Sequence, residues 1–158
     1  FLRTITGLRC LGARVVPRRF RPGSGYTCAN PSALTLAHRL DATLCFVDDN
    51  KNDKGASKHD QWESGDVGGF QAYLPGAQED NPDAAATYVT DDQDDCGLLN
   101  VAASNNTLNL VLHDPGTHKF VKYVAASAPG SRWDIAAEFE IHPDDVAGDD
   151  EGDEGEES

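Results

Sequence analysis

The stretch Arg-Trp-Asp-Ile-Ala-Ala-Glu-Phe-Glu-Ile, residues 132–141, indicates the fold more clearly than any other part of the sequence. Apolar and polar side chains alternate along it with a period of two, as they do in a half-buried β-strand. The alternation predicts two rows: Trp133, Ile135, Ala137, Phe139 and Ile141 toward the core, and Arg132, Asp134, Glu138 and Glu140 toward solvent. In this interpretation the Trp133 side chain anchors the core.

The same period recurs in several segments that precede residues 132–141. It predicts strands over residues 40–47, 69–74, 107–112 and 119–124, and shorter ones over 26–29 and 86–89. Asp114-Pro115-Gly116 is a turn signal, so residues 107–124 are predicted to form an antiparallel hairpin. Pro75-Gly76 marks the end of another strand. Short strands with such turns are typical of an all-β sandwich or jelly roll, with short helical pieces only in residues 1–12 and 32–40.

The net charge of −14 is distributed unevenly over the 158 residues. Residues 1–40 contain seven Arg and no acid, whereas residues 144–158 contain nine acids and no base. We expect residues 1–13 to connect to an upstream region, 14–143 to form the sandwich, and 144–158 to be a disordered acidic tail. A surface this acidic repels phosphate, so we do not expect a nucleic-acid partner, and the basic N-terminal segment is the part able to contact an acidic surface.

The composition also constrains the cellular context. The sequence has neither a run of 18 apolar residues nor a leader with a cleavage site, so neither a membrane span nor secretion is expected. Cys10, Cys28, Cys45 and Cys96 form no CxxC pair and no zinc-like cluster, and Cys28 and Cys45 fit buried thiols. We therefore expect a reducing compartment, the nucleus or the cytoplasm.

Two common ligand motifs, the calcium loop and the phosphate loop, are not fulfilled by this sequence. The segments that begin at Asp92 and Asn50 resemble calcium loops, but they place a thiol or a lysine among the oxygen ligands and lack the closing glutamate. The glycines at 23–25 and 65–69 lead into strands rather than helices, so they do not form a phosphate loop.

Non-haem iron is the decisive test for a jelly roll, because such iron is held by two His and one carboxylate. His142-Pro143-Asp144 is the one His-x-Asp in the sequence, and no His follows it. His59-Asp60 and His113-Asp114 are adjacent pairs, whose side chains would point to opposite faces of a strand. A triad built in another order stays open as a minor alternative.

Arg132-Trp133-Asp134 admits two interpretations. Arg132 and Asp134 are two residues apart on one face, so they can pair with neighbours across the sheet. The functional interpretation is a peptide- or partner-binding surface, and the structural interpretation, which we prefer, is a packed corner of the sandwich.

Five blocks of sequence resemble a known family. They are residues 18–27 (RRFRPGSGYT), 40–46 (LDATLCF), 62–70 (WESGDVGGF), 120–124 (FVKYV) and 128–135 (APGSRWDI). The chain, from about Val15 to Ile141, is similar to the C-terminal degradation domain of eukaryotic iron/2-oxoglutarate-dependent prolyl dihydroxylases that act on a small-subunit ribosomal protein. One departure is Gly25, where the family tends to have an acid before the Tyr-Thr pair.

The resemblance implies a double-stranded β-helix that has lost its iron ligands and serves protein–protein contact and regulation. Fe(II), 2-oxoglutarate and ascorbate are then cofactors of a catalytic domain elsewhere in the parent protein, and the start at Phe1 fits the loss of that domain. We accordingly assign no catalytic, cofactor-binding or metal-ligating residue to this chain. The implied partners are the catalytic domain, contacted through the basic N-terminal segment, and ribosomal or regulatory proteins, without a membrane.

Two alternatives stay open. The chain is either this binding domain or a self-contained iron/2-oxoglutarate dioxygenase with atypical ligands, with His113 or His118 on the metal and Arg132 on the cosubstrate. A weaker hypothesis takes the acidic tail, residues 144–158, as an attraction for basic partners such as ribosomal or histone proteins.

Overall fold

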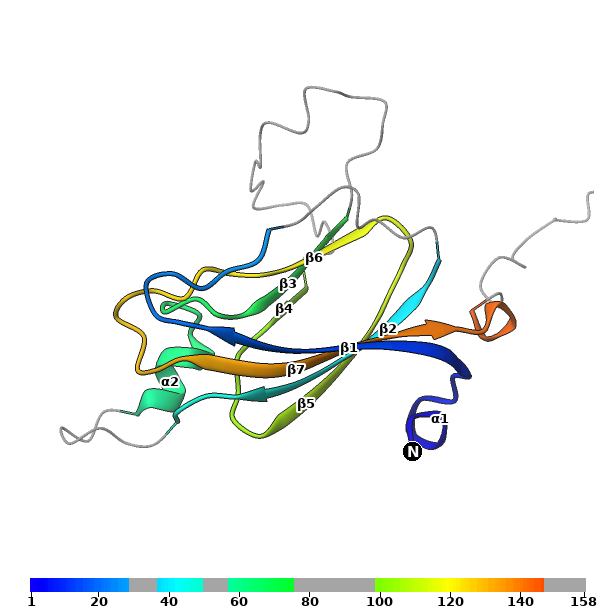
Figure 1. Cartoon of the computed structure of the whole chain (residues 1–158), viewed down its shortest axis with the longest axis horizontal. Coiled ribbons are helices and arrows are strands. Elements are labelled where there is room, and N and C mark those ends of the chain that lie inside the picture. The colour runs from blue at the N-terminus through cyan, green and yellow to red at the C-terminus, as the bar shows by residue number, and fades with distance from the viewer. Residues whose placement is uncertain (29–36, 50–56, 76–98, 147–158) are drawn as a thin grey trace, which may run out of the picture.

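The computed structural model of the chain describes residues 1–28, 37–49, 57–75 and 99–146 (Figure 1). Its helices are α1 (Leu2–Thr6), α2 (Lys58–Glu63) and a 3-10 helix (Pro143–Asp145). Its strands are β1 (Cys10–Phe20), β2 (Arg39–Phe46), β3 (Gln71–Pro75), β4 (Leu99–Val101), β5 (Thr107–His113), β6 (Thr117–Val121) and β7 (Arg132–Ile141).

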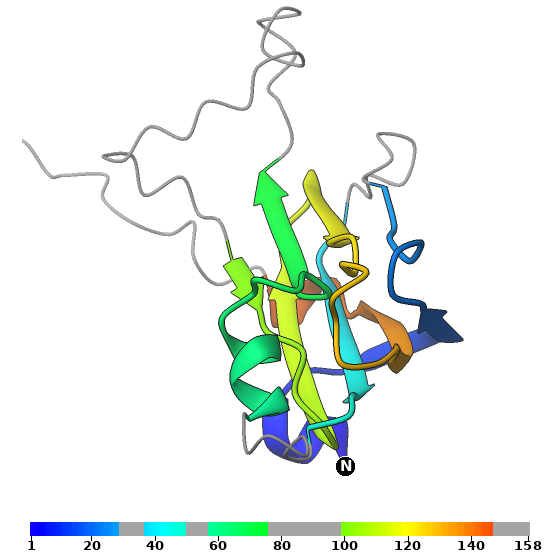
Figure 2. The same cartoon turned by 90° about the vertical axis from the view of Figure 1, so that its left-hand side faces the viewer.

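The strands form two antiparallel sheets that face each other. One sheet has the order β1-β7-β2-β5 and the other has the order β4-β3-β6. Figure 1 and the turned view in Figure 2 show the three-stranded sheet lying over one side of the four-stranded sheet. The all-β expectation with few short helices is confirmed, and the jelly-roll winding stays a prediction.

The predicted hairpin over residues 107–124 is wrong, although both of its strands exist. β5 pairs with β2 in the four-stranded sheet, and β6 pairs with β3 in the other sheet. The turn at Asp114-Pro115-Gly116 therefore carries the chain from one sheet to the other. A turn signal marks a change of direction, and it leaves open which strand becomes the hydrogen-bonded neighbour.

Four elements had no prediction in the sequence: β1, β4, α2 and the 3-10 helix. β1 contains Pro17 and a cluster of arginines, which hide its period, but it is an edge strand, where proline is tolerated. α2 begins after Ser57, whose hydroxyl accepts a hydrogen bond from the Asp60 amide. His59 and Asp60 therefore lie on a helix, not on a strand as assumed above. Conversely, the strand predicted at residue 26 is not formed over residues 26–28.

Over residues 132–136 the burial pattern of β7 is reversed relative to the prediction, whereas Glu140 is exposed as predicted. Arg132 and Asp134 are buried, whereas Trp133 is 50% exposed and Ile135 is 43% exposed. Of the row predicted to point inward, Ile141 is buried. The reason is that arginine and aspartate side chains from different strands neutralise each other between the sheets, which the period of one strand cannot reveal.

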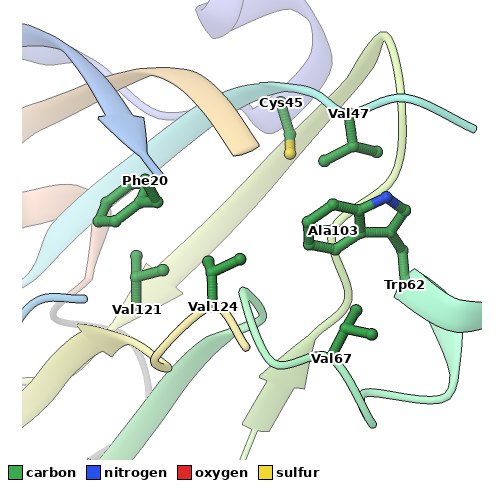
Figure 3. Close-up of a cluster of buried hydrophobic side chains, with 8 residues drawn as sticks. All are labelled: Phe20, Cys45, Val47, Trp62, Val67, Ala103, Val121 and Val124. Atoms are coloured by element: carbon green, nitrogen blue, oxygen red, sulfur yellow. The ribbon is translucent and has the colours of Figure 1, made fainter. Parts of the chain in front are cut away.

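The apolar core lies at the end of the sandwich next to α2. Trp62 of α2 packs there with side chains from both sheets and from the loops, namely Phe20, Cys45, Val47, Val67, Ala103, Val121 and Val124 (Figure 3). The Trp62 indole Nε1 donates a hydrogen bond to the Asp48 carbonyl at 3.1 Å, which satisfies its polar atom in the core. Cys45 is buried as predicted, whereas Cys28 is exposed and that expectation is wrong.

Both ends of the expected sandwich extend beyond its predicted limits. β1 begins at Cys10 and pairs with β7 from there, so the expected boundary at residue 14 falls within a strand. Asp144 and Asp145, assigned above to the tail, lie in the 3-10 helix, and both carboxylates contact Arg9. The predictions for residues 32–36, 86–89 and 147–158 lie outside the described residues.

Candidate functional site

The inner face of the four-stranded sheet carries a buried polar network centred on Asp41 of β2. The Asp41 side chain is 1% exposed, and its carboxylate lies 2.8 Å from the Lys119 ammonium of β6. The Tyr73 hydroxyl of β3 donates to it at 3.2 Å, and His113 Nε2 of β5 lies 3.4 Å away. A carboxylate this deeply buried needs such partners, and here they come from both sheets.

The network continues along the interior toward the apolar core. The Gln71 side-chain amide nitrogen donates to the Tyr73 hydroxyl, and the Thr43 hydroxyl donates to the side-chain oxygen Oε1 of Gln71 at 3.1 Å. Burial, followed by the negative charge of Asp41, raises the pKa of Tyr73 well above its ordinary value. Tyr73 therefore stays a neutral phenol and acts as a hydrogen-bond donor to Asp41 rather than as a base.

Lys119 also joins Asp41 to a second carboxylate. Its ammonium lies 2.9 Å from Glu138 of β7, and the Arg39 guanidinium lies 3.6 Å from the same side chain. Burial opposes ionisation of Glu138, but the hydrogen bond and charge of Lys119, with the charge of Arg39, still lower its pKa. Glu138 is therefore ionised at neutral pH, and Lys119 bridges the two carboxylates.

A second ionic cluster lies on the same face at Asp134, four residues before Glu138 in β7. Its side chain is fully buried and accepts two hydrogen bonds from Arg18 of β1, at 2.7 Å and 2.9 Å. Arg132 contacts the same carboxylate at 2.9 Å and donates to the carbonyl of Gly69. The Arg18 contact is bidentate, the strongest geometry for such a pair. Arg132 and Asp134 therefore form a packed corner, whereas Trp133, the residue between them, does not belong to it.

The inner face does not bring the histidines of the dioxygenase alternative together. His113 lies beside Asp41, whereas His118 alternates to the opposite face of β6 from Lys119. Arg132 is committed to Asp134. The groups at this position are the Asp41 carboxylate, one imidazole, one phenol and one ammonium, and this set does not fit ferrous iron. Within the described ranges, no group of three His, Cys, Asp or Glu residues is placed to hold a metal.

The remaining histidines have local partners. His38 contacts Asp114 at 3.1 Å, and His59 contacts Glu63 one turn further along α2. His142 accepts the Asp144 amide at the start of the 3-10 helix. These contacts are structural and lie outside the Asp41 network.

The outer face of the four-stranded sheet has the opposite character. We call it the outer face and define it by side chains that are opposite one another in the strand register. Its four rows are Arg19–Trp133–Phe46, Pro17–Ile135–Leu44–Leu108, Val15–Ala137–Ala42–Leu110 and Ala13–Phe139–Leu40–Leu112. Arg19 is the one charged residue in these rows. Within these rows Trp133, Ile135, Val15, Leu108 and Leu112 are exposed, whereas Leu40 and Ala42 are buried.

A groove of about 390 Å³ lies on the outer face at Trp133. It is lined by Pro17, Arg18, Arg19, Phe46, Trp133, Asp134 and Ile135. The Arg19 guanidinium lies 4.6 Å from the centre of the Trp133 ring, within the range of a cation–π contact. The prediction that Trp133 anchors the core is therefore wrong, because this side chain lies on the accessible surface.

Comparison with known proteins assigns the chain to a family. Residues 1–147 match the family model described as the C-terminal degradation domain of oxoglutarate- and iron-dependent oxygenases. The chain belongs to this family. This degradation domain is also 35% identical, over 140 residues, to the prolyl 3,4-dihydroxylase OGFOD1 of Ostreococcus tauri. That similarity covers 88% of the chain and 25% of the relative, so the degradation domain spans about a quarter of that protein's length.

The family resemblance inferred from the sequence blocks is thus confirmed, but two features of the degradation domain were missed. The Asp41–Lys119–Glu138 network joins residues far apart in the sequence, and its one signal was an aspartate inside the apolar block LDATLCF. The outer face was missed because an apolar row normally points to the core. No helix within the described residues is long and apolar enough to cross a membrane.

Proposed function

We propose that this chain is a non-catalytic binding domain of a longer iron- and 2-oxoglutarate-dependent prolyl dihydroxylase. In that protein it would pack on the catalytic domain and hold regulatory or substrate proteins, while the catalytic domain hydroxylates a prolyl residue of a ribosomal protein. Fe(II), 2-oxoglutarate and ascorbate would act in the catalytic domain. The proposed setting is the nucleus or the cytoplasm.

The observation that carries this proposal is the mutual neutralisation of the charged groups on the inner face. Asp41 and Glu138 share Lys119, and Asp134 is held by Arg18 and Arg132. A metal at Asp41 would have to displace a lysine ammonium at 2.8 Å, and a dicarboxylate at Arg132 would have to displace the Asp134 carboxylate. Both displacements would leave a buried charge without its partner, which is costly.

Calorimetry tests the proposal on the 158-residue chain. Ferrous iron is titrated anaerobically with and without 2-oxoglutarate, and in parallel into the His113→Ala variant. We expect no stoichiometric heat that depends on 2-oxoglutarate. Weak iron binding to the many exposed acids would be equal in both proteins and independent of 2-oxoglutarate. Binding of one iron and one 2-oxoglutarate per chain, lost in His113→Ala, would refute the proposal.

The self-contained dioxygenase is the competing function, and one contact favours it: His113 lies beside a buried carboxylate. It requires that the 158-residue chain form succinate from 2-oxoglutarate and that replacement of His113 and His118 by alanine abolish this turnover. We expect no turnover in the unmodified chain.

A further inference from the structure

We propose that the outer face of the four-stranded sheet is the surface that packs on the catalytic region of the parent polypeptide. This inference rests on the proposed function, and it names the surface through which the two parts meet. The sequence predicted a contact through the positively charged N-terminal segment. The inference replaces it with a contact through an apolar sheet face.

The composition of the outer face is unusual for a solvent-facing sheet. An antiparallel sheet with one solvated face normally alternates apolar residues toward the core with polar residues toward water. Here the four rows contain one charged residue, Arg19, in a chain with a net charge of −14. Exposed apolar side chains that are contiguous over several strands mark interaction sites, whereas single ones do not.

Two arginines of the N-terminal segment, Arg9 and Arg18, are occupied within the chain. Arg18 is bonded to Asp134 on the inner face, and Arg9 is bonded to Asp145. The outward row of β1 is Ala13, Val15, Pro17 and Arg19, by its register with β7. On the outer face, β1 therefore offers a partner an apolar edge with Arg19 at one end, whereas the exposed Arg14 belongs to the opposite row.

The occupant we commit to is the catalytic region of the same polypeptide. Three quarters of the Ostreococcus tauri relative lies outside the part that this chain matches, which is enough protein to cover an entire sheet face. Its contact surface should be apolar and should place a carboxylate opposite Arg19, because Arg19 is the one charged group on the outer face. Trp133, with its groove, has the position and chemistry of an interface anchor.

Hydroxyl-radical footprinting read by mass spectrometry tests the inference without a substitution. The longer polypeptide that the proposed function requires is compared with the 158-residue chain at several concentrations. Tyr123 and Tyr26, which are 45% and 58% exposed and lie outside the rows of the outer face, serve as matched controls for Trp133 at 50%. We expect labelling of Trp133, Phe46 and Ile135 to fall about five-fold or more in the longer polypeptide, as in the dry centre of an interface, with Tyr123 unchanged.

Three results would overturn the inference. Trp133 labelled equally in both proteins means that the outer face stays open. Equal protection of Tyr123 and Trp133 means that the contact is not selective for this face. A second copy covers the face if Trp133 is protected in the 158-residue chain, loses this protection on dilution, and is not protected in the longer polypeptide. The footprint is independent of iron and 2-oxoglutarate binding, so its failure differs from that of the proposed function.

Discussion

At the scale of single residues, the pairing of charged side chains determines which of them are buried. Asp134 and Arg18 are 116 positions apart in the sequence, yet they meet in a bidentate pair inside the sandwich. The adjacent Trp133 points the other way, toward solvent. Hydrophobicity alone predicts that Trp133 is buried and Asp134 exposed, and this is the reverse of what is found. A paired aspartate can be buried at a tolerable cost, and an exposed tryptophan can serve to contact a partner.

Replacement of Asp134 by asparagine tests the inner ionic cluster. Arg18 and Arg132 would then share a buried site without a negative charge, and we expect the free energy of unfolding to fall by about 3–5 kcal/mol. Urea denaturation followed by circular dichroism measures this change. The matched control is Asp114→Asn, because that side chain is 81% exposed and its loss should cost less than about 1 kcal/mol. Similar small losses in both variants would contradict the role given to the cluster.

At the scale of elements, the contacts between strands and loops decide the arrangement. β5 and β6 are consecutive, but the turn between them passes from one sheet to the other. The loop from α2 to β3 runs against the segment after β6, where the Gly69 amide donates to the Lys122 carbonyl at 3.1 Å. Gly68 adopts a positive φ of 69° there, and a side chain at this position would overlap the Tyr123 carbonyl.

Gly68→Ala is therefore expected to be strongly destabilising. The β-carbon would add a backbone clash to the strain of a left-handed conformation, with a combined cost of about 3 kcal/mol or more. Gly116→Ala is the matched control, because Gly116 has a φ of 79° and open space around it. It should lose only the strain, about 1 kcal/mol. Chemical denaturation of both variants gives the comparison, and equal losses would show that the close approach at Gly68 is unimportant.

At the scale of the whole molecule, the two ends of the described fold are fastened together. Arg9 is 136 positions from Asp145, and its amide and guanidinium bind that carboxylate at 2.6 Å and 2.8 Å. The His142 amide donates to the Arg9 carbonyl at 2.9 Å. This contact holds the start of β1 against the end of β7 and so completes the sheet that carries the outer face.

The pH dependence of stability tests this contact. The hydrogen bonds from Arg9 lower the pKa of Asp145 below its ordinary value of 3.8, so folding favours the ionised form. The stabilisation is then fully present above about pH 4 and is lost as the pH falls through the lowered pKa. Asp145→Asn should therefore melt at a lower temperature than the unmodified chain at pH 6, and the difference should shrink toward pH 3. Thermal melts at both pH values measure it, and a constant difference would contradict the mechanism.

Local sequence patterns were sufficient to establish the all-β class of the fold and the family. Period-two segments and turn residues predicted β2, β3, β5, β6 and β7, because alternation and turn chemistry are local properties of the chain. The blocks around Trp62 and Arg132 carried the family resemblance, since they hold the glycines and the buried aromatic residue that shape the core. The pairing capacity of Arg132 and Asp134 was also visible from their spacing.

The neighbours of each strand, and the face of the four-stranded sheet that points inward, depend on contacts between distant segments. The contacts between Arg18 and Asp134 and between Lys119 and Asp41 join distant segments, and they reverse the faces that the hydrophobic pattern of β7 predicts. The physical reason is that alternation gives two rows of side chains but not their direction. Direction depends on what the facing sheet supplies, and here it supplies a lysine and a tyrosine for buried carboxylates.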